Sequence, residues 1–183
     1  MPDSKIPPEV EPLVAFHGHF CPGLLIGWRA ARLALKLLHA SRDRDEELVA
    51  ITENDACGVD AIQFVLGCTF GKGNLHFRDW GKQAFTIYRR CDGKGIRISL
   101  RSPERDISRE ESARRLLEEP DEVLFHVGEP REPIPECARI RRSLRCSLCG
   151  EKVMETRMRM LADGRPACMP CAEEGIPESG MKS

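Results

Sequence analysis

Four cysteines in the C-terminal part of the chain have the type and spacing of a zinc site. Cys146 and Cys149 form one Cys-x-x-Cys pair, Cys168 and Cys171 form another, and eighteen residues separate the pairs. Each pair can present two thiolates to one tetrahedral Zn²⁺, and the separation lies in the range of zinc ribbons. The alternative is two unrelated pairs of reactive thiols. A module this short buries little apolar surface, so we expect bound metal to supply much of its folding energy.

The sequence around this module is basic. Seven Lys or Arg residues and two Glu residues lie between Arg139 and Arg159. Such a stretch can meet nucleic acid, an acidic protein or an anionic substrate, or it can form an ordinary solvated surface. No Phe, Trp or Tyr follows Phe125, so base stacking on this module is unsupported. We therefore favour the solvated surface and keep nucleic-acid docking as the alternative.

A second group of metal-type residues lies near the start of the chain, where His17, His19 and Cys21 occupy alternate positions. In an extended segment these three side chains would share one face. Cys21 immediately precedes Pro22, which suits the first position of a helix, so Cys21 is predicted at the helix N-cap. There the helix dipole favours the thiolate, which binds metals or acts as a nucleophile. The alternative is that the imidazoles cap loops and Cys21 is merely buried.

The segment from Glu53 to Gln63 is the third chemically informative stretch. Cys57 lies where a predicted strand turns into a predicted helix, a common place for reactive groups, and we expect it to join the first cluster. Asp60 and Gln63 are one helical turn apart, so they face the same way and would orient the substrate or the ligands. An exposed helix face is the alternative for that pair.

Two lysines and three further cysteines complete the candidates. Lys72, in a short glycine-rich stretch, and Lys82 are candidates to bind anionic groups of a substrate or cofactor. A plain turn is the alternative for the glycine-rich stretch. Cys68 is expected to be a small buried side chain. Cys91 and Cys137 have no partner spacing and receive no role.

Helices and strands must position these residues, and the apolar periodicity predicts where they lie. The run Leu24–Leu38, apolar except for three cations, predicts a helix buried in a core or a dimer interface. Asp92-Gly93 is a hairpin signal, and Ser108–Glu111 is a capping box. Because strands and helices do not alternate regularly, we predict an α+β core with a mixed or antiparallel sheet. The other predictions are an extended arm over 1–12, strands over 47–52, 84–90, 95–100 and 123–127, a helix over 59–68, and a helix from Ser108 to Pro120.

The 183 residues, 41% of them apolar, suit one medium domain plus a small module. We expect a core domain over 1–130, a Pro-rich linker over 131–143 and a zinc-finger module over 144–183. The net charge of −1 excludes a global attraction to nucleic acid. The first residues lack the apolar region of a signal peptide, and nine cysteines without one indicate a reducing compartment. We therefore expect a cytoplasmic protein without membrane contact.

Three segments together resemble the FmdE family, named after a component of formylmethanofuran dehydrogenase. They are His17–Gly23, Cys57–Gln63, and Gly67–Leu75 followed by Gly81-Lys82, and the similarity runs from about Pro12 to Val127. The resemblance implies an α+β core in an intertwined dimer with a Cys/His cleft, and a link to tungsten- or molybdenum-dependent one-carbon chemistry. Some members of the family also carry a C-terminal zinc finger. Dehydrogenase activity is not implied, because the metal–pterin and iron–sulfur clusters of that enzyme belong to its other components.

Two functional hypotheses follow. The first is a metal- or thiol-dependent enzyme, or an accessory protein or subunit of an oxidoreductase, whose site is formed by His17, His19, Cys21 and Cys57. A metal ion there would be catalytic or cargo, and the C-terminal Zn²⁺ would be structural. The second is a regulatory or binding protein that uses the zinc finger to dock nucleic acid or a protein. The expected partners are a second copy of the chain, a small-molecule substrate or metal cargo, and other protein subunits.

Overall fold

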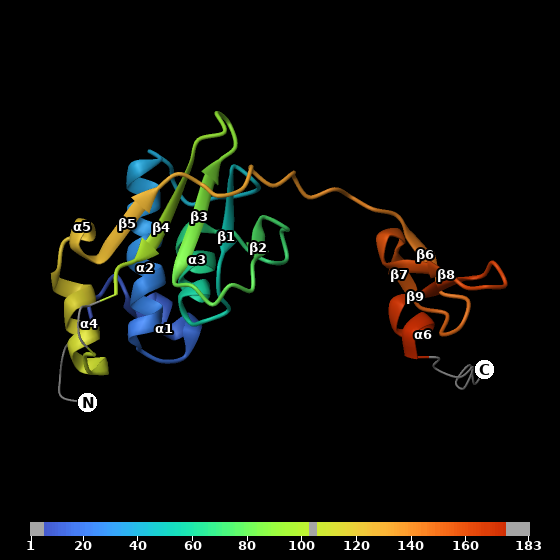
Figure 1. Cartoon of the computed structure of the whole chain (residues 1–183), viewed down its shortest axis with the longest axis horizontal. Coiled ribbons are helices and arrows are strands. Elements are labelled where there is room, and N and C mark those ends of the chain that lie inside the picture. The colour runs from blue at the N-terminus through green and yellow to red at the C-terminus, as the bar shows by residue number, and fades with distance from the viewer. Residues whose placement is uncertain (1–5, 103–105, 175–183) are drawn as a thin grey trace. The chain divides into compact units, whose positions relative to one another are not determined.

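The computed structural model describes residues 6–102 and 106–174 of the chain. The chain divides into two compact units, Met1–Ala138 (unit 1) and Arg139–Ser183 (unit 2), and each is described by itself (Figure 1). Among the described residues, no helix is both long enough and apolar enough to cross a membrane.

Unit 1 is built on a five-stranded mixed sheet with helices packed against it (Figure 1). The strand order is β2-β1-β3-β4-β5, in which β1 and β2 are parallel and the other neighbours antiparallel. The predicted α+β fold with a mixed sheet is therefore confirmed. In chain order the elements are α1 (Glu11–His17), α2 (Pro22–Leu37), β1 (Leu48–Thr52), α3 (Gly58–Leu66), β2 (Leu75–Phe77), β3 (Ala84–Arg89), β4 (Gly95–Leu100), α4 (Arg109–Glu118), α5 (Asp121–Leu124) and β5 (Phe125–Gly128).

The main core of unit 1 lies between one face of the sheet and the helices. Alternate strand residues such as Ala50, Phe85 and Ile98 are fully buried in it, because successive side chains point to opposite faces. Helix α2 contributes nine buried residues and packs against α3 and α4. The apolar surface of α2 is thus covered within a single chain, and its burial does not require a second copy.

A Pro-rich strap, residues 129–138, covers the opposite face of the sheet. Ile134 packs against the apolar residues of β1 and β3 on that face. Tyr88 donates a hydrogen bond from its hydroxyl to the carbonyl of Glu132, and Arg90 donates to the carbonyl of Pro135 at 2.7 Å. Residues 131–138 of the expected linker therefore pack on unit 1, and residues 139–143 belong to unit 2.

Two elements of unit 1 were not predicted. Residues 11–12 of the expected extended arm form the start of α1, and Pro12 sits in its first turn, where the missing N–H costs nothing. The arm's residues 1–5 lie outside the described part of the chain. Strand β2 has only three residues, too few to show a periodicity, and its partner β1 is remote in sequence. Because α1 was not predicted, the structure differs at His17, which ends a helix instead of lying in an extended segment.

Unit 2 consists of two small hairpins and a terminal helix. Strand β6 (Ser143–Arg145) pairs with β7 (Lys152–Met154), and β8 (Met158–Met160) pairs with β9 (Pro166–Cys168), all antiparallel. A 3₁₀ turn, η1 (Glu155–Arg157), joins the hairpins, and α6 (Met169–Glu174) follows β9. The buried residues of this unit are three of its four paired cysteines and one alanine. So small a core agrees with the expectation that metal binding contributes to its folding.

Candidate functional site

The structure brings His17, His19, Cys21 and Cys57 together in unit 1. One ligand atom from each side chain lies within 4.8 Å of those of the other three. The residues come from the end of α1, the following loop, and the positions just before α2 and α3. We call this group the core cluster.

Glycines on α2 and α3 explain why the two cysteines meet. The two helices touch backbone to backbone, because a Cβ atom on Gly27 would overlap the carbonyl group of Gly58. One turn earlier on α2, a Cβ on Gly23 would lie 3.2 Å from the Cβ of Cys57. Only glycine permits so close an approach. The N-terminal ends of both helices, each preceded by a cysteine, are therefore held side by side.

Cys21 is the N-cap of α2, as predicted from Pro22. Its Sγ accepts a hydrogen bond from the backbone N–H of Leu24 at 3.4 Å, and it lies 4.0 Å from Nε2 of His17. Burial raises the pKa of the Cys57 thiol, and its contact with Cys21 raises that pKa further. Two adjacent thiols resist joint ionisation, and a bound cation would reverse this by stabilising both thiolates.

Asp60 and Gln63 point toward the ligands of the core cluster. Oδ2 of Asp60 lies 2.7 Å from Nδ1 of His17, and Nε2 of Gln63 donates to Oδ1 of Asp60 at 3.4 Å. A carboxylate only accepts, so Nδ1 of His17 is the donor and Nε2 keeps its lone pair for a ligand. This is the carboxylate–histidine arrangement that orients metal-binding imidazoles in many proteins.

His19 differs from the other members of the core cluster. It is exposed, whereas His17, Cys21 and Cys57 are partly buried. It follows Gly18, whose φ of +98° lies in the left-handed region and ends α1. Within the described part of the chain, its one side-chain contact of a specific kind is with the ring of His17, at a centroid distance of 4.5 Å.

Sequence reasoning missed Asn54, which fixes the loop that carries Cys57. Asn54 is buried, its Oδ1 accepts from the N–H of Ala56 at 3.0 Å, and its Nδ2 donates to the carbonyl of Lys82 at 2.6 Å. An Asn two residues before such a donor is the signature of an Asx turn, which was the available signal. Lys82 thus takes part through its backbone, while its ammonium lies 5.8 Å from the ring of Trp80.

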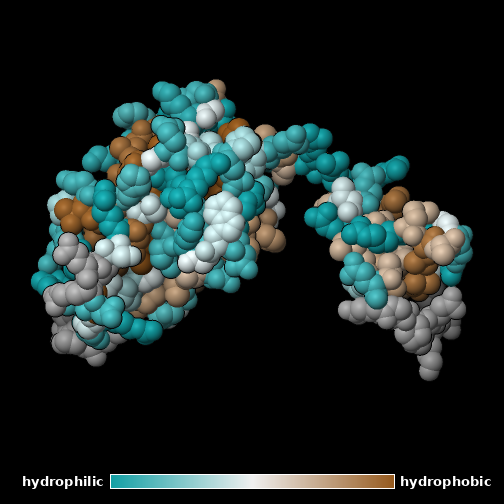
Figure 2. Space-filling model, in the orientation of Figure 1, coloured by the Kyte–Doolittle hydropathy of each residue, from teal (hydrophilic) through white to brown (hydrophobic). Residues whose placement is uncertain are grey.

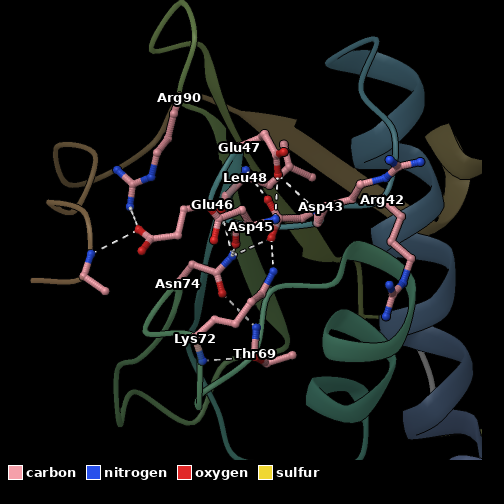
Figure 3. A network of polar contacts seen from close by, with 12 residues as sticks. Arg42, Asp43, Asp45, Glu46, Glu47, Leu48, Thr69, Lys72, Asn74 and Arg90 are labelled. Atoms are coloured by element: carbon pink, nitrogen blue, oxygen red, sulfur yellow. Dashed lines mark hydrogen bonds and ion pairs between the residues drawn. The ribbon is translucent and has the colours of Figure 1, made fainter. Parts of the chain in front are cut away.

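Lys72 lies away from the core cluster, beyond the opposite end of α3 from Cys57. Figure 3 shows it in a polar network around Asp43, whose side chain is fully buried. Asp43 forms an ion pair with Lys72 and also accepts hydrogen bonds from the N–H of Leu48 at 2.8 Å and from Asn74 at 2.9 Å. The ammonium of Lys72 therefore neutralises a buried carboxylate that joins three loop segments, and this is a structural role.

The remaining core cysteines stand apart from the cluster. Cys68 is buried, and burial raises the pKa of its thiol to about 12, which suits the predicted small buried side chain. Cys91 and Cys137 are exposed.

In unit 2 the thiols of Cys146, Cys149, Cys168 and Cys171 also lie within 4.8 Å of one another. Sγ of Cys146 accepts hydrogen bonds from the N–H groups of Leu148 at 3.4 Å and Cys168 at 3.3 Å. Backbone N–H groups, that of Cys149 first, lower the pKa of Cys146 to about 6, whereas the Cys168 thiol helps raise the pKa of Cys171 to about 12. Four sulfur donors with N–H support on one of them fit a metal such as Zn²⁺. The predicted four-cysteine site thus has the geometry it requires.

Comparison with known proteins gives three matches. The family model described as "FmdE, Molybdenum formylmethanofuran dehydrogenase operon" matches residues 16–126. A probable S-adenosyl-L-methionine-binding protein of Archaeoglobus fulgidus is 32% identical over 207 aligned positions, which cover 93% of this chain and 54% of that protein. The chain therefore spans about half the length of this relative. The crystal structure of an FmdE-like protein of tungsten formylmethanofuran dehydrogenase from Syntrophus aciditrophicus has a TM-score of 0.69 at 26% identity and covers 92% of both chains.

Proposed function

The chain belongs to the FmdE family, and from that premise we propose that its core cluster is a metal site at which a small molecule is bound or transformed. In this proposal the four-cysteine site of unit 2 holds a structural Zn²⁺. The chemistry served is one-carbon metabolism that depends on tungsten or molybdenum, and the chain acts as a small-molecule enzyme or as an accessory protein that handles the metal.

A single observation carries the proposal, namely the convergence of two thiols and two imidazoles from four separate segments. Soft sulfur and imidazole ligands suit zinc and other late transition metals. A metal ion held there would polarise a bound substrate or lower the pKa of a bound water. The chain's own residues supply the rest: Asp60 orients His17, Asn54 fixes the loop before Cys57, and the glycine contact between α2 and α3 holds the thiols together.

The one-carbon link is supported by the descriptions of the family and of the Syntrophus aciditrophicus structure. The binding of S-adenosyl-L-methionine stays with the relative whose description mentions it, because this chain spans only 54% of that protein. Between the enzyme and the accessory protein, the choice depends on whether the metal keeps a coordination position open to solvent.

A second candidate function, docking of an acidic partner by unit 2, is favoured by one observation. Arg145 lies directly opposite Lys152 in the β6–β7 hairpin, and both are exposed. Like charges at directly opposite positions destabilise a hairpin, so their presence fits a surface that meets negative charge. Figure 2 shows hydrophilic residues around exposed apolar ones on the visible face of this unit. Nucleic acid is the less favoured partner, because unit 2 contains no Phe, Trp or Tyr.

We also propose that unit 1 pairs with a second copy of the chain. Four aromatic side chains are exposed on this unit: Phe16 (56%), Phe70 (80%), Phe77 (45%) and Trp80 (46%). Exposed aromatic groups of this size are frequent in protein–protein interfaces. Phe16 directly precedes His17, so an interface over it would border the core cluster.

Thiol alkylation tests the metal site. The full chain is stripped of metal, one portion is resupplied with Zn²⁺, and both are alkylated and analysed by mass spectrometry. We expect Cys21 and Cys57 to react in the stripped protein and to be protected when the metal returns. Exposed Cys91 and Cys137 are internal controls that should react equally in both portions. If Cys21 and Cys57 react at the same rate with and without metal, the proposed function is wrong.

A further inference from the structure

We propose that His19 is the exchangeable ligand of the core cluster, and that a small anionic molecule reaches the metal at the position His19 vacates. This inference rests on the proposed metal site and defines how that site is entered.

Three of the four ligands are held in place by contacts within the chain. His17 is fixed by Asp60 at 2.7 Å, and Cys21 is fixed at the N-cap of α2 by the N–H of Leu24. Cys57 is fixed by its close packing against Gly23, where an added Cβ would lie 3.2 Å from its own Cβ. Ligands that are already ordered lose little conformational entropy when a metal binds, so these three should provide most of the affinity.

No comparable restraint acts on His19 within the described residues. Its side chain is exposed, and among those residues it makes no hydrogen bond or ion pair, only the ring contact with His17. A Cβ on the preceding Gly18 would meet nothing within 4 Å, so the backbone beside His19 is also uncovered. Ordering an exposed, unrestrained side chain costs conformational entropy, which makes His19 the ligand that is released most easily.

Release of His19 would leave two thiolates, one imidazole and an open fourth position. In zinc proteins, structural sites are closed by four protein ligands, whereas two cysteines and one histidine with a free position form one of the catalytic arrangements. Both α2 and α3 begin at the core cluster, and their N-terminal N–H groups favour negative charge nearby. The carboxylate of Asp60 is already engaged by His17 and Gln63. These features favour an anionic donor, such as a carboxylate or a thiolate, at the vacated position.

Cobalt spectroscopy of the full chain tests this assignment. All proteins carry Cys146→Ser and Cys149→Ser so that Co²⁺ reports on the core cluster alone. His19→Ala and His17→Ala are compared with this parent by titration with Co²⁺, whose absorption is sensitive to thiolate ligation and coordination number. Azide, a small anion, is then added to each cobalt-loaded protein.

We expect His19→Ala to keep the thiolate–cobalt absorption with a loss of affinity below about tenfold, and His17→Ala to lose substantially more. Azide should change the spectrum of His19→Ala at a concentration at least about tenfold lower than in the parent, because no imidazole competes with it. Equal losses of affinity in the two variants, or a His19→Ala spectrum that azide leaves unchanged, would overturn the assignment of His19. Absence of thiolate–cobalt absorption in the parent would instead overturn the metal site, and this inference with it.

Discussion

Nδ1 of His17 donates a hydrogen bond to Oδ2 of Asp60 at 2.7 Å, and this contact joins the last residue of α1 to the first turn of α3. Because Nδ1 carries the proton, Nε2 is left as the ligand atom, and it faces Sγ of Cys21 at 4.0 Å. The orientation of one ring nitrogen therefore depends on how two helices pack.

Asp60→Ala should weaken metal binding at the core cluster by about 10–100-fold, the usual effect of removing a carboxylate behind a ligating histidine. The affinity is measured by competition with a chromophoric chelator. Asp55→Ala is the matched control, because Asp55 is an exposed carboxylate in the same strand-to-helix turn. An affinity in Asp60→Ala equal to that in Asp55→Ala would show that Asp60 does not orient a ligand.

Gly27→Ala should destabilise unit 1 by at least about 1–3 kcal/mol, since its Cβ would overlap the backbone of Gly58 and push α2 from α3. The separation should also weaken metal binding, because it moves Cys21 from Cys57. Urea unfolding measures the first effect, and chelator competition measures the second. Gly71→Ala is the control, because a Cβ there meets nothing within 4 Å. Equal midpoints for the two variants would rule out the tight helix contact.

The pH dependence of stability should contain a contribution from His76. Burial lowers the pKa of His76 below 6.5, and the positive charges of Arg78 and Arg90 lower it further, against the opposing effect of Glu132 and Glu46. The unfolded chain then binds a proton that the folded chain resists. The contribution is fully present above about pH 6.5 and is lost as the pH falls below that value.

His76→Gln should therefore flatten the fall in unfolding free energy between about pH 6.5 and pH 5. Denaturant unfolding at a series of pH values measures it, with exposed His126→Gln as the control. A pH profile of His76→Gln that parallels the wild type would contradict the assignment.

Cys149→Ser should release the metal of unit 2 and leave unit 1 folded. A metal-dependent module loses most of its folding energy without its ion, so limited proteolysis should cut after Arg139. The strap over 129–138 should stay protected, because Tyr88 and Arg90 hold it against the sheet. Intact protection of unit 2 in the variant would show that its fold does not depend on the four thiols.

Most of the core cluster could be predicted from local sequence. Cys21 was placed at a helix start by Pro22, and Cys57 at a strand-to-helix turn by the apolar pattern around it, and the structure has both there. The four-cysteine site followed from spacing alone, because two Cys-x-x-Cys pairs leave few other geometries.

Long-range contacts could not be predicted in the same way. The pair His17–Asp60 depends on the packing of α1 on α3, and the extended geometry expected for His17 was wrong because α1, only seven residues long, gave too weak a periodic signal to be predicted. The strap was expected to be a linker, since nothing in a Pro-rich segment reveals that Ile134 has an apolar sheet face to cover. Lys72 was judged by the glycines beside it, whereas its partner Asp43 lies 29 residues away.

The metal content of the full chain tests the central claim most directly. After saturation with Zn²⁺ and removal of excess ion, elemental analysis should find about two ions per wild-type chain, one for each Cys-containing cluster. Cys57→Ser and Cys149→Ser should each lower the content toward one ion, and Cys68→Ser, at a buried cysteine outside both clusters, should leave it at two. One ion per wild-type chain, retained in Cys57→Ser and lost in Cys149→Ser, would contradict the account, because the core cluster would then hold no metal.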